Sequence, residues 1–140
     1  MAIDKLYKYL ILFAFGGLCY GAVELAARGY THWTMLVLGG VCFILIGLIN
    51  EHIPWEMPLA YQMLIGSVII TTLEFATGCV VNIVLGWNIW GYSNETWNLC
   101  GQICLKYSVY WYFISAVAII IDDFIRWTVF GEEKPHYKLF

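Results

Sequence analysis

The residues best suited to chemistry lie in the stretch Thr71–Leu105, TTLEFATGCVVNIVLGWNIWGYSNETWNLCGQICL. This stretch places a carboxylate, Glu74, inside an apolar segment and follows it with a loop rich in Trp, Tyr, Asn and Gly. An ionisable side chain at membrane depth is costly to bury, so it is a functional-site hypothesis by default. Such a carboxylate can bind a cation, carry a proton or accept a hydrogen bond from a ligand.

A second carboxylate, Glu24, lies in a similar apolar setting, and Arg28 follows it at i+4 on the same helix face. The segment Gly21–Gly29 weakly resembles Thr71–Gly78, which suggests two hairpin repeats of parallel orientation. Three interpretations stay open. The two glutamates face each other and share one proton; or Arg28 neutralises Glu24 and leaves Glu74 free to bind a ligand; or both form structural struts between helices.

The loop after Glu74 is the third candidate feature. Trp90 and Tyr92 could form a lid that hydrogen-bonds a guest, because irregular backbone at membrane depth is tolerated only where protein or a water-filled cavity covers it. Alternatively, they belong to an interfacial aromatic belt. Asn98 and Gln102 are amides at the start of the last apolar run and could point into a helix bundle. The predicted ligand-binding residues are therefore Glu24, Arg28, Glu74, Trp90, Tyr92, Asn98 and Gln102.

The composition defines the class of protein that must position these residues. The chain has 140 residues, of which 61% are hydrophobic and 12% charged, and its mean hydropathy is +0.74. Soluble domains have about 25% charged residues, so the sequence predicts a single-domain, all-α, polytopic membrane protein. The net charge is −3 and no stripe of Lys or Arg is present to neutralise phosphates, which argues against a nucleic-acid partner.

Four apolar runs predict four transmembrane helices, with the aromatic loop between the third and the fourth: Leu6–Ala27, Trp33–Ile49, Leu59–Leu85 and Gln102–Ile121. The third run is longer than one upright span needs, so we expect it to tilt, extend past the membrane or break near Thr77 and Gly78. Asp122, Asp123 and Arg126 are expected to form a charged cluster at the interface, where a cytoplasmic tail of residues 122–140 begins.

The distribution of basic residues predicts the orientation. The two termini carry Lys5, Lys8, Arg126, Lys134 and Lys138, whereas the opposite side carries Arg28 and Lys106. Because Lys and Arg are enriched in cytoplasmic segments, we expect a multi-pass protein of the cell membrane with both termini in the cytoplasm. The aromatic loop then lies at the outer face.

Several function classes lack their signatures. The five cysteines are odd in number and three lie inside apolar runs, so they do not form a disulfide framework. No nucleotide-binding, metalloprotease, hydrolase or paired-cysteine zinc motif is present. The sequence therefore predicts no metal and no cofactor.

The order of three motifs resembles a known family. LEFATG (Leu73–Gly78), WGYSN (Trp90–Asn94) and NLCGQICL (Asn98–Leu105) precede an aromatic-rich span, as in the family called putative ABC-transporter type IV, or CmpB-like. The resemblance covers about Gly17–Phe113, and Gly91 stands where the family usually has Asp. It implies a small multi-span membrane protein labelled as a transporter, and any use of ATP would need a separate subunit. The family positions it points to are Glu24, Glu74, Tyr92, Asn98 and Gly101.

We therefore expect a small membrane protein that binds and transports a small polar or cationic solute at a Glu-containing site near the outer face. Four short spans make a narrow pathway, which favours a homodimer. One alternative is a membrane-embedded enzyme that acts on a lipid or amphiphile with Glu74 as general base. Another is a non-catalytic subunit of a larger membrane complex. The sequence favours an enzyme less, because no Ser or Cys stands beside a His in a catalytic arrangement.

Overall fold

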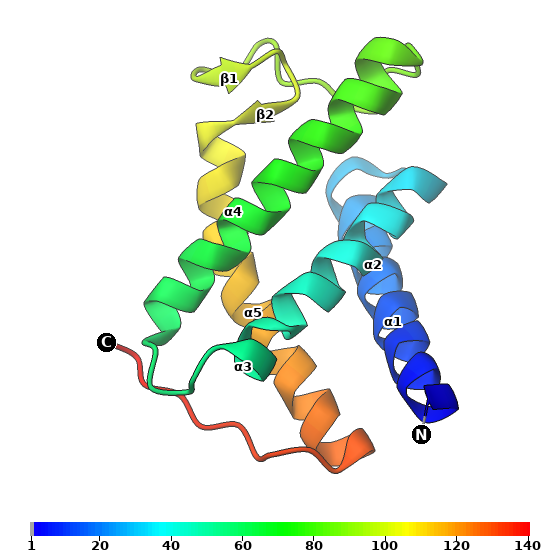
Figure 1. Cartoon of the computed structure of the whole chain (residues 1–140). Coiled ribbons are helices and arrows are strands. Elements are labelled where there is room, and N and C mark those ends of the chain that lie inside the picture. Colours follow the sequence, from blue (N-terminus) through cyan, green and yellow to red (C-terminus); the bar gives the residue numbers. More distant parts are fainter. Residues whose placement is uncertain (1) are drawn as a thin grey trace.

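The structure, a computed structural model, describes residues 2–140, and nearly all its regular structure is helical (Figure 1). A two-residue antiparallel hairpin of β1 and β2 precedes the last helix. The elements in chain order are α1 (Ala2–Arg28), α2 (Trp33–Gly47), α3 (Ile49–His52), α4 (Leu59–Gly78), the π-helix η1 (Cys79–Val84), β1 (Asn98–Leu99), β2 (Ile103–Cys104) and α5 (Leu105–Phe130).

Three helical segments are long and apolar enough to cross a membrane: Ala2–Arg28, Trp33–His52 and Leu59–Val84. They confirm the prediction of a helical membrane protein. Among the described residues 2–140, α5 has 26 residues and is long enough, but it is not among the segments that are also apolar enough. Its second half contains Asp122, Asp123 and Arg126. The expected fourth span is thus a long helix with a charged end.

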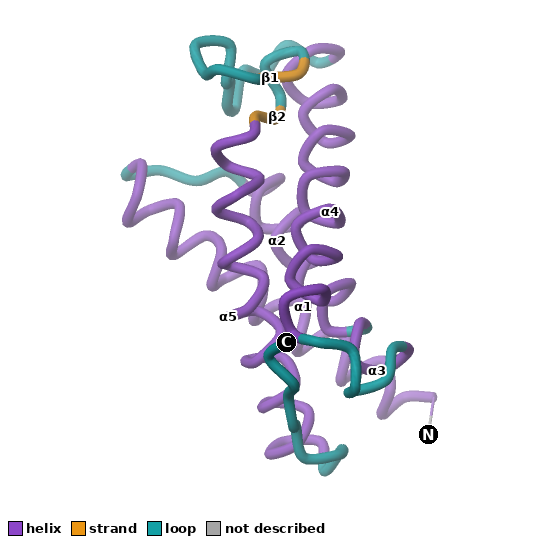
Figure 2. The backbone as a smooth tube through the Cα atoms, turned by 90° about the vertical axis from the view of Figure 1, so that its left-hand side faces the viewer, coloured by secondary structure: helices purple, strands orange, loops and turns teal. Residues whose placement is uncertain are grey.

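The helices form two hairpins. α1 packs against α2, α4 packs against α5, and the two pairs meet mainly through α2 (Figures 1 and 2). Small residues permit close approach within the first pair, as they commonly do between membrane helices. A Cβ atom added at Gly17 would lie only 2.6 Å from the backbone oxygen of Leu36. The two views also define two ends of the bundle: the loop end, with residues 85–104, and the tail end, with the N-terminus, α3 and residues 131–140.

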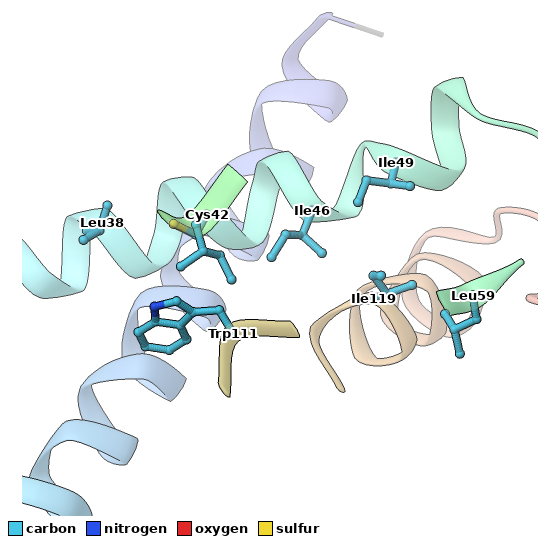
Figure 3. Packing of buried hydrophobic residues seen from close by; sticks show 8 residues of the cluster. Leu38, Cys42, Ile46, Ile49, Leu59, Trp111 and Ile119 are labelled. Atoms are coloured by element: carbon cyan, nitrogen blue, oxygen red, sulfur yellow. The ribbon is translucent and has the colours of Figure 1, made fainter. Parts of the chain in front are cut away.

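The main apolar core lies where α2 meets α4 and α5. Figure 3 shows Leu38, Cys42 and Ile46 of α2 facing Trp111 and Ile119 of α5. Many other large apolar side chains point outward on all the long helices, as expected for helices whose outer surfaces contact lipid. Examples are Leu18, Val68 and Val117, with exposed fractions of 68%, 58% and 57%.

The third apolar run changes helix type where we expected a break. α4 ends at Gly78, and the chain continues as the π-helix η1 without leaving the helical path. π-Helical turns commonly occur at functional sites. Here the π-helix begins at Cys79, directly after the end of α4, the helix that carries Glu74.

The last predicted span differs from the observed helix at both ends. Gln102 lies in the turn between β1 and β2, because Cys100 and Gly101 have φ angles of 54° and 69°, which interrupt a helix. At the other end α5 continues to Phe130, so the tail is residues 131–140 rather than 122–140. The helix continues because Asp122 pairs with Arg126 one turn later inside the bundle. Gly131, with φ 67°, then terminates it.

Candidate functional site

Glu74 lies at the centre of the candidate site and is 3% exposed. The Tyr92 hydroxyl donates a hydrogen bond of 2.7 Å to its Oε1, and the Trp111 indole Nε1–H donates one of 2.9 Å to its Oε2. These donors come from the loop and from α5, whereas Glu74 comes from α4. Each carboxylate oxygen has two acceptor positions, so the site can still accept hydrogen bonds from a bound molecule.

Tyr92 is held in place on both sides. Its ring stacks on Tyr107 of α5 with 4.8 Å between centroids, and its backbone N–H donates to the Gly101 carbonyl over 2.7 Å. Burial and the nearby Glu74 carboxylate raise the pKa of the Tyr92 hydroxyl above its usual range. Tyr92 therefore remains a neutral hydrogen-bond donor at physiological pH. The loop residue thus acts as a fixed polar contact to Glu74.

Glu24 is arranged differently from Glu74. It is 8% exposed, and its Oε2 accepts a hydrogen bond of 2.6 Å from Arg28 Nε. Arg28 also lies over the ring of Tyr30, 4.5 Å from the centroid, and its Nη1 reaches the Ile89 carbonyl at 3.5 Å. Arg28 therefore connects α1 with the loop that follows η1. The structure brings Glu24 and Arg28 together as an ion pair.

Tyr20 of α1 and Trp111 of α5 contact each other beside Glu74. Their rings are 6.1 Å apart. The Tyr20 hydroxyl lies next to Glu24 and within electrostatic range of Glu74. Glu24 and Glu74 are also close enough for their charges to repel each other. The two carboxylates thus belong to one polar region at the loop end of the bundle.

A second group of polar contacts fixes the loop to the end of η1. The Asn82 amide nitrogen donates to Gln102 Oε1 over 2.8 Å, and Asn82 Oδ1 accepts from the Ile89 backbone N–H over 2.7 Å. The Trp90 indole donates to the Gln102 carbonyl over 3.1 Å. A Cβ atom at Gly78 would lie 2.6 Å from Gln102 Oε1, so this glycine leaves room for the amide.

The structure therefore places the predicted residues in three groups. Glu74 and Tyr92 are in direct contact, Glu24 and Arg28 form the neighbouring ion pair, and Trp90 and Gln102 hold the loop. Asn98 is separate: it is exposed, donates to the Glu95 carbonyl over 2.8 Å and accepts from the Gly101 N–H over 3.0 Å. Its contacts shape the turn between β1 and β2.

A cavity of about 270 Å³ extends from Glu74 toward the middle of the bundle. Residues of α1, α2, α4 and α5 line it, and nearly all of its lining is apolar. Besides Glu74, its polar lining is limited to Tyr20, Trp111 and two thiols, those of Cys19 and Cys42. Among residues 2–140, no group of three or more His, Cys, Asp or Glu side chains could hold a metal ion.

The comparisons with known proteins give one match. A family model described as Putative ABC-transporter type IV matches residues 9–131. The chain belongs to this family. The assignment confirms the resemblance seen in the three sequence motifs, and the family description makes this a transporter-related membrane protein. Comparison with curated proteins and with solved structures gave no match.

In this member of the family, three residues contribute to the site that sequence reasoning did not single out: Trp111, Tyr20 and Asn82. Trp111 is separated from Glu74 by 37 positions, and its neighbours in the sequence are aromatic, so it resembled an ordinary lipid-facing residue. Asn82 did carry a signal, because an amide inside an apolar run has to find a polar partner.

A separate charged network occupies the tail end of the bundle. Asp122, Asp123 and Arg126 are 0%, 4% and 1% exposed, so they are buried rather than interfacial as expected. Arg126 Nε donates to Asp122 Oδ2 over 2.6 Å, while its Nη1 lies 3.7 Å from Glu51 and 3.6 Å from Glu132. Pairing with Arg126 keeps the Asp122 carboxylate in the helix.

The tail folds back over this network. Asp123 Oδ2 accepts hydrogen bonds from Asn50 at 2.7 Å and from the Tyr137 hydroxyl at 2.8 Å. The Leu59 backbone N–H donates to the Lys138 carbonyl over 2.7 Å, and Lys8 pairs with Glu132. These contacts close the end of the bundle opposite Glu74, so the two polar regions are separated by the apolar core.

Proposed function

We propose that this protein binds a small polar or cationic solute at Glu74 and moves it across the membrane. The observation that carries the proposal is the contrast between the two buried glutamates. Glu24 has Arg28 as its cationic partner, whereas within residues 2–140 no basic side chain forms an ion pair with Glu74. A buried carboxylate without a cation costs free energy, and a bound cation or proton would supply the missing charge.

The surroundings of Glu74 support this proposal. Two fixed donors hold the carboxylate in one orientation, and the cavity beside it offers space for a guest. The family assignment supports a role in transport. Among Glu74's hydrogen-bond partners, within the described chain, there is no Ser, Cys or His that could act as a nucleophile or base, which supports binding over catalysis.

We also propose how the protein is oriented in the membrane and that it forms a homodimer. The basic residues near both termini favour a cytoplasmic tail end in the cell membrane, so that Glu74 would lie in the outer half. The sequence contains no nucleotide-binding motif of an ATPase. Coupling to protons at Glu74 therefore suits the chain better than coupling to ATP. A homodimer would widen a pathway that four helices leave narrow.

Native mass spectrometry of the protein released from mild detergent tests the proposal. We expect wild-type protein to retain a small molecule and the Glu74→Gln variant to lose it, because the amide keeps the size of the side chain and removes the charge. The Glu133→Gln variant is the matched control, since Glu133 is exposed in the tail and the same charge is removed.

The outcomes separate the candidate functions. A guest lost only in Glu74→Gln establishes the site and identifies the solute. Identical masses without a guest in all three proteins would contradict the proposal and favour the role of a non-catalytic subunit. If Glu74→Gln and Glu24→Gln both abolish the folded yield, the glutamates are structural struts instead.

A further inference from the structure

The cavity beside Glu74 has the size of an organic body rather than of a hydrated ion. Its volume is about 270 Å³, and a cavity of about 150 Å³ lined by apolar side chains holds benzene. A body of two fused rings, or an alkyl chain of comparable volume, would fill it. The wall residues include Phe15, Leu38, Phe43 and Ile70, which offer no hydrogen bonds to solvate a polar guest.

The cavity opens sideways between α1 and α5. Contacts between these two helices are sparse, because α1 packs on α2 and α5 packs on α4. The rim consists of apolar residues that face outward, among them Val23 with an exposed fraction of 55% and Val117 with 57%. In a membrane-spanning bundle, this opening faces the lipid. A guest can therefore enter from the bilayer only if its body is apolar enough to dissolve there.

The part of the cavity that Glu74 lines has the chemistry of a cation site. Glu74 provides a carboxylate with free acceptor positions, and the rings of Tyr20 and Trp111 flank it. A cation is attracted both to a carboxylate and to the faces of aromatic rings. The Trp111 indole N–H is already bound to Glu74, so its ring is held beside the position that a guest's charge would occupy.

We propose that the guest is an amphiphilic ammonium ion, with an apolar body in the cavity and its ammonium group at Glu74. This inference rests on the proposed function, because it names the class of solute for the same carboxylate. The lateral opening supplies the entry path, the apolar walls bind the body, and Glu74 with the two rings binds the head. A purely polar cation would leave the cavity unfilled.

Isothermal titration calorimetry of the protein in lipid nanodiscs tests this inference, with empty nanodiscs subtracted. The probes are 2-naphthylmethylammonium, its neutral analogue 2-naphthalenemethanol, and ethanolammonium, which has the charge but no apolar body. We expect the first probe to bind about tenfold or more tightly than either of the others, because charge-assisted hydrogen bonds are roughly twice as strong as neutral ones and only this probe also fills the cavity.

Each pattern of binding has a distinct meaning. Equal binding of the two naphthyl compounds would overturn the inference, because the cavity would then be a simple apolar or lipid-chain site. Tighter binding of ethanolammonium would also overturn it, yet leave the proposed function standing. Binding of none of the three probes would overturn the inference, while the native mass spectrum separately decides the proposed function.

Two variants keep the test independent of any single substitution. Ala118→Leu adds volume to the cavity wall and should weaken binding of 2-naphthylmethylammonium about tenfold or more without touching Glu74, since overpacked sites reject guests. Ala116→Leu is its matched control, because Ala116 lies on the same helix outside the cavity lining. If both variants lose binding of this probe equally, or if neither variant loses it, the proposed location of the site is wrong.

Discussion

At the scale of single residues, Glu74 shows how a costly group is retained. Its two oxygen atoms each have a donor, and the donors, from the loop and from α5, lie 18 and 37 positions beyond Glu74 in the sequence. Hydrogen bonds to a charged acceptor contribute about 1.5–3 kcal/mol each. They offset part of the cost of burial, but they do not supply a positive charge. That difference separates Glu74 from Glu24.

Replacing Tyr92 by Phe tests the first of these hydrogen bonds. The variant leaves Glu74 Oε1 without its donor, and we expect the free energy of unfolding to fall by about 1.5–3 kcal/mol. The measurement is unfolding in mixed detergent micelles with increasing SDS, followed by circular dichroism. The control is Tyr61→Phe, because Tyr61 is 61% exposed on the same helix as Glu74; it should change stability by less than about 0.5 kcal/mol.

The same pair can be checked by a double-mutant cycle. In the Glu74→Gln background, Tyr92→Phe should cost clearly less than in wild type, because residues in one hydrogen-bond network are not additive. Equal costs in both backgrounds would show that Tyr92 stabilises the protein through its stacking on Tyr107 and not through Glu74.

The sequence singled out Glu74 and Tyr92 as candidate site residues but not the contact between them. A carboxylate in an apolar run is visible in any sequence, because its burial cost is a property of the residue type. The partner depends on how the loop folds back, and that depends on backbone angles at Cys100 and Gly101. Asn98 shows a second limit of the sequence. We expected this amide at the start of a helix, whereas its side chain stabilises the turn between β1 and β2.

At the scale of elements, the apolar runs predicted the first three helices to within a few residues. Small residues in the first run, such as Gly17, allow the backbones of α1 and α2 to approach closely. The end of α5 was missed for a physical reason. Asp122 and Arg126 neutralise each other one turn apart, so a charge that looked like a helix end is compatible with a buried helix.

Gly17→Ala tests the packing of α1 on α2. The new methyl group would meet the backbone oxygen of Leu36 at 2.6 Å, and a backbone atom cannot move aside as a flexible side chain can. We expect a loss of about 1–3 kcal/mol from overpacking, against a gain of up to about 1 kcal/mol in helix propensity. Unfolding in SDS mixed micelles measures the balance.

Gly91→Ala is the control for that substitution, since no atom lies within 4 Å of the position of its new Cβ. It should leave stability nearly unchanged. If Gly17→Ala were as stable as wild type, the two helices would have room to separate, and the close contact would not contribute to the stability of the first hairpin.

Asn82→Leu tests how η1 holds the loop. The substitution removes the acceptor of the Ile89 N–H and the donor to Gln102. Leaving buried polar groups unpaired costs about 1–3 kcal/mol, so hydrogen exchange in residues 86–92 should accelerate roughly 10- to 100-fold, at 1.4 kcal/mol per factor of ten. Asn94→Ala, at an exposed position in the loop, should leave this exchange unchanged, and acceleration in both would contradict the role of Asn82.

At the scale of the whole molecule, the bundle has two polar ends that differ in design. The loop end presents an acidic residue beside a cavity, whereas the tail end is closed by ion pairs around Arg126 and by residues 131–140. Glu74 is 3% exposed and borders a cavity lined by four helices, whereas the opposite end is covered by the tail.

The side of the membrane on which the tail end lies is the last prediction. The pairing of Lys8 with Glu132 places the start of α1 and the end of α5 at the same end of the bundle, so both termini must lie on one side. The basic residues near both termini favour the cytoplasm for this end of the bundle.

A green fluorescent protein fused to Phe140 should therefore fluoresce in bacterial cells, since it folds in the cytoplasm and not after export by the general secretory route. Alkaline phosphatase inserted after Ser93 should be active, because it needs an oxidising compartment for its disulfides. The reverse pattern would place Glu74 in the inner half and invert the direction from which a solute meets the site.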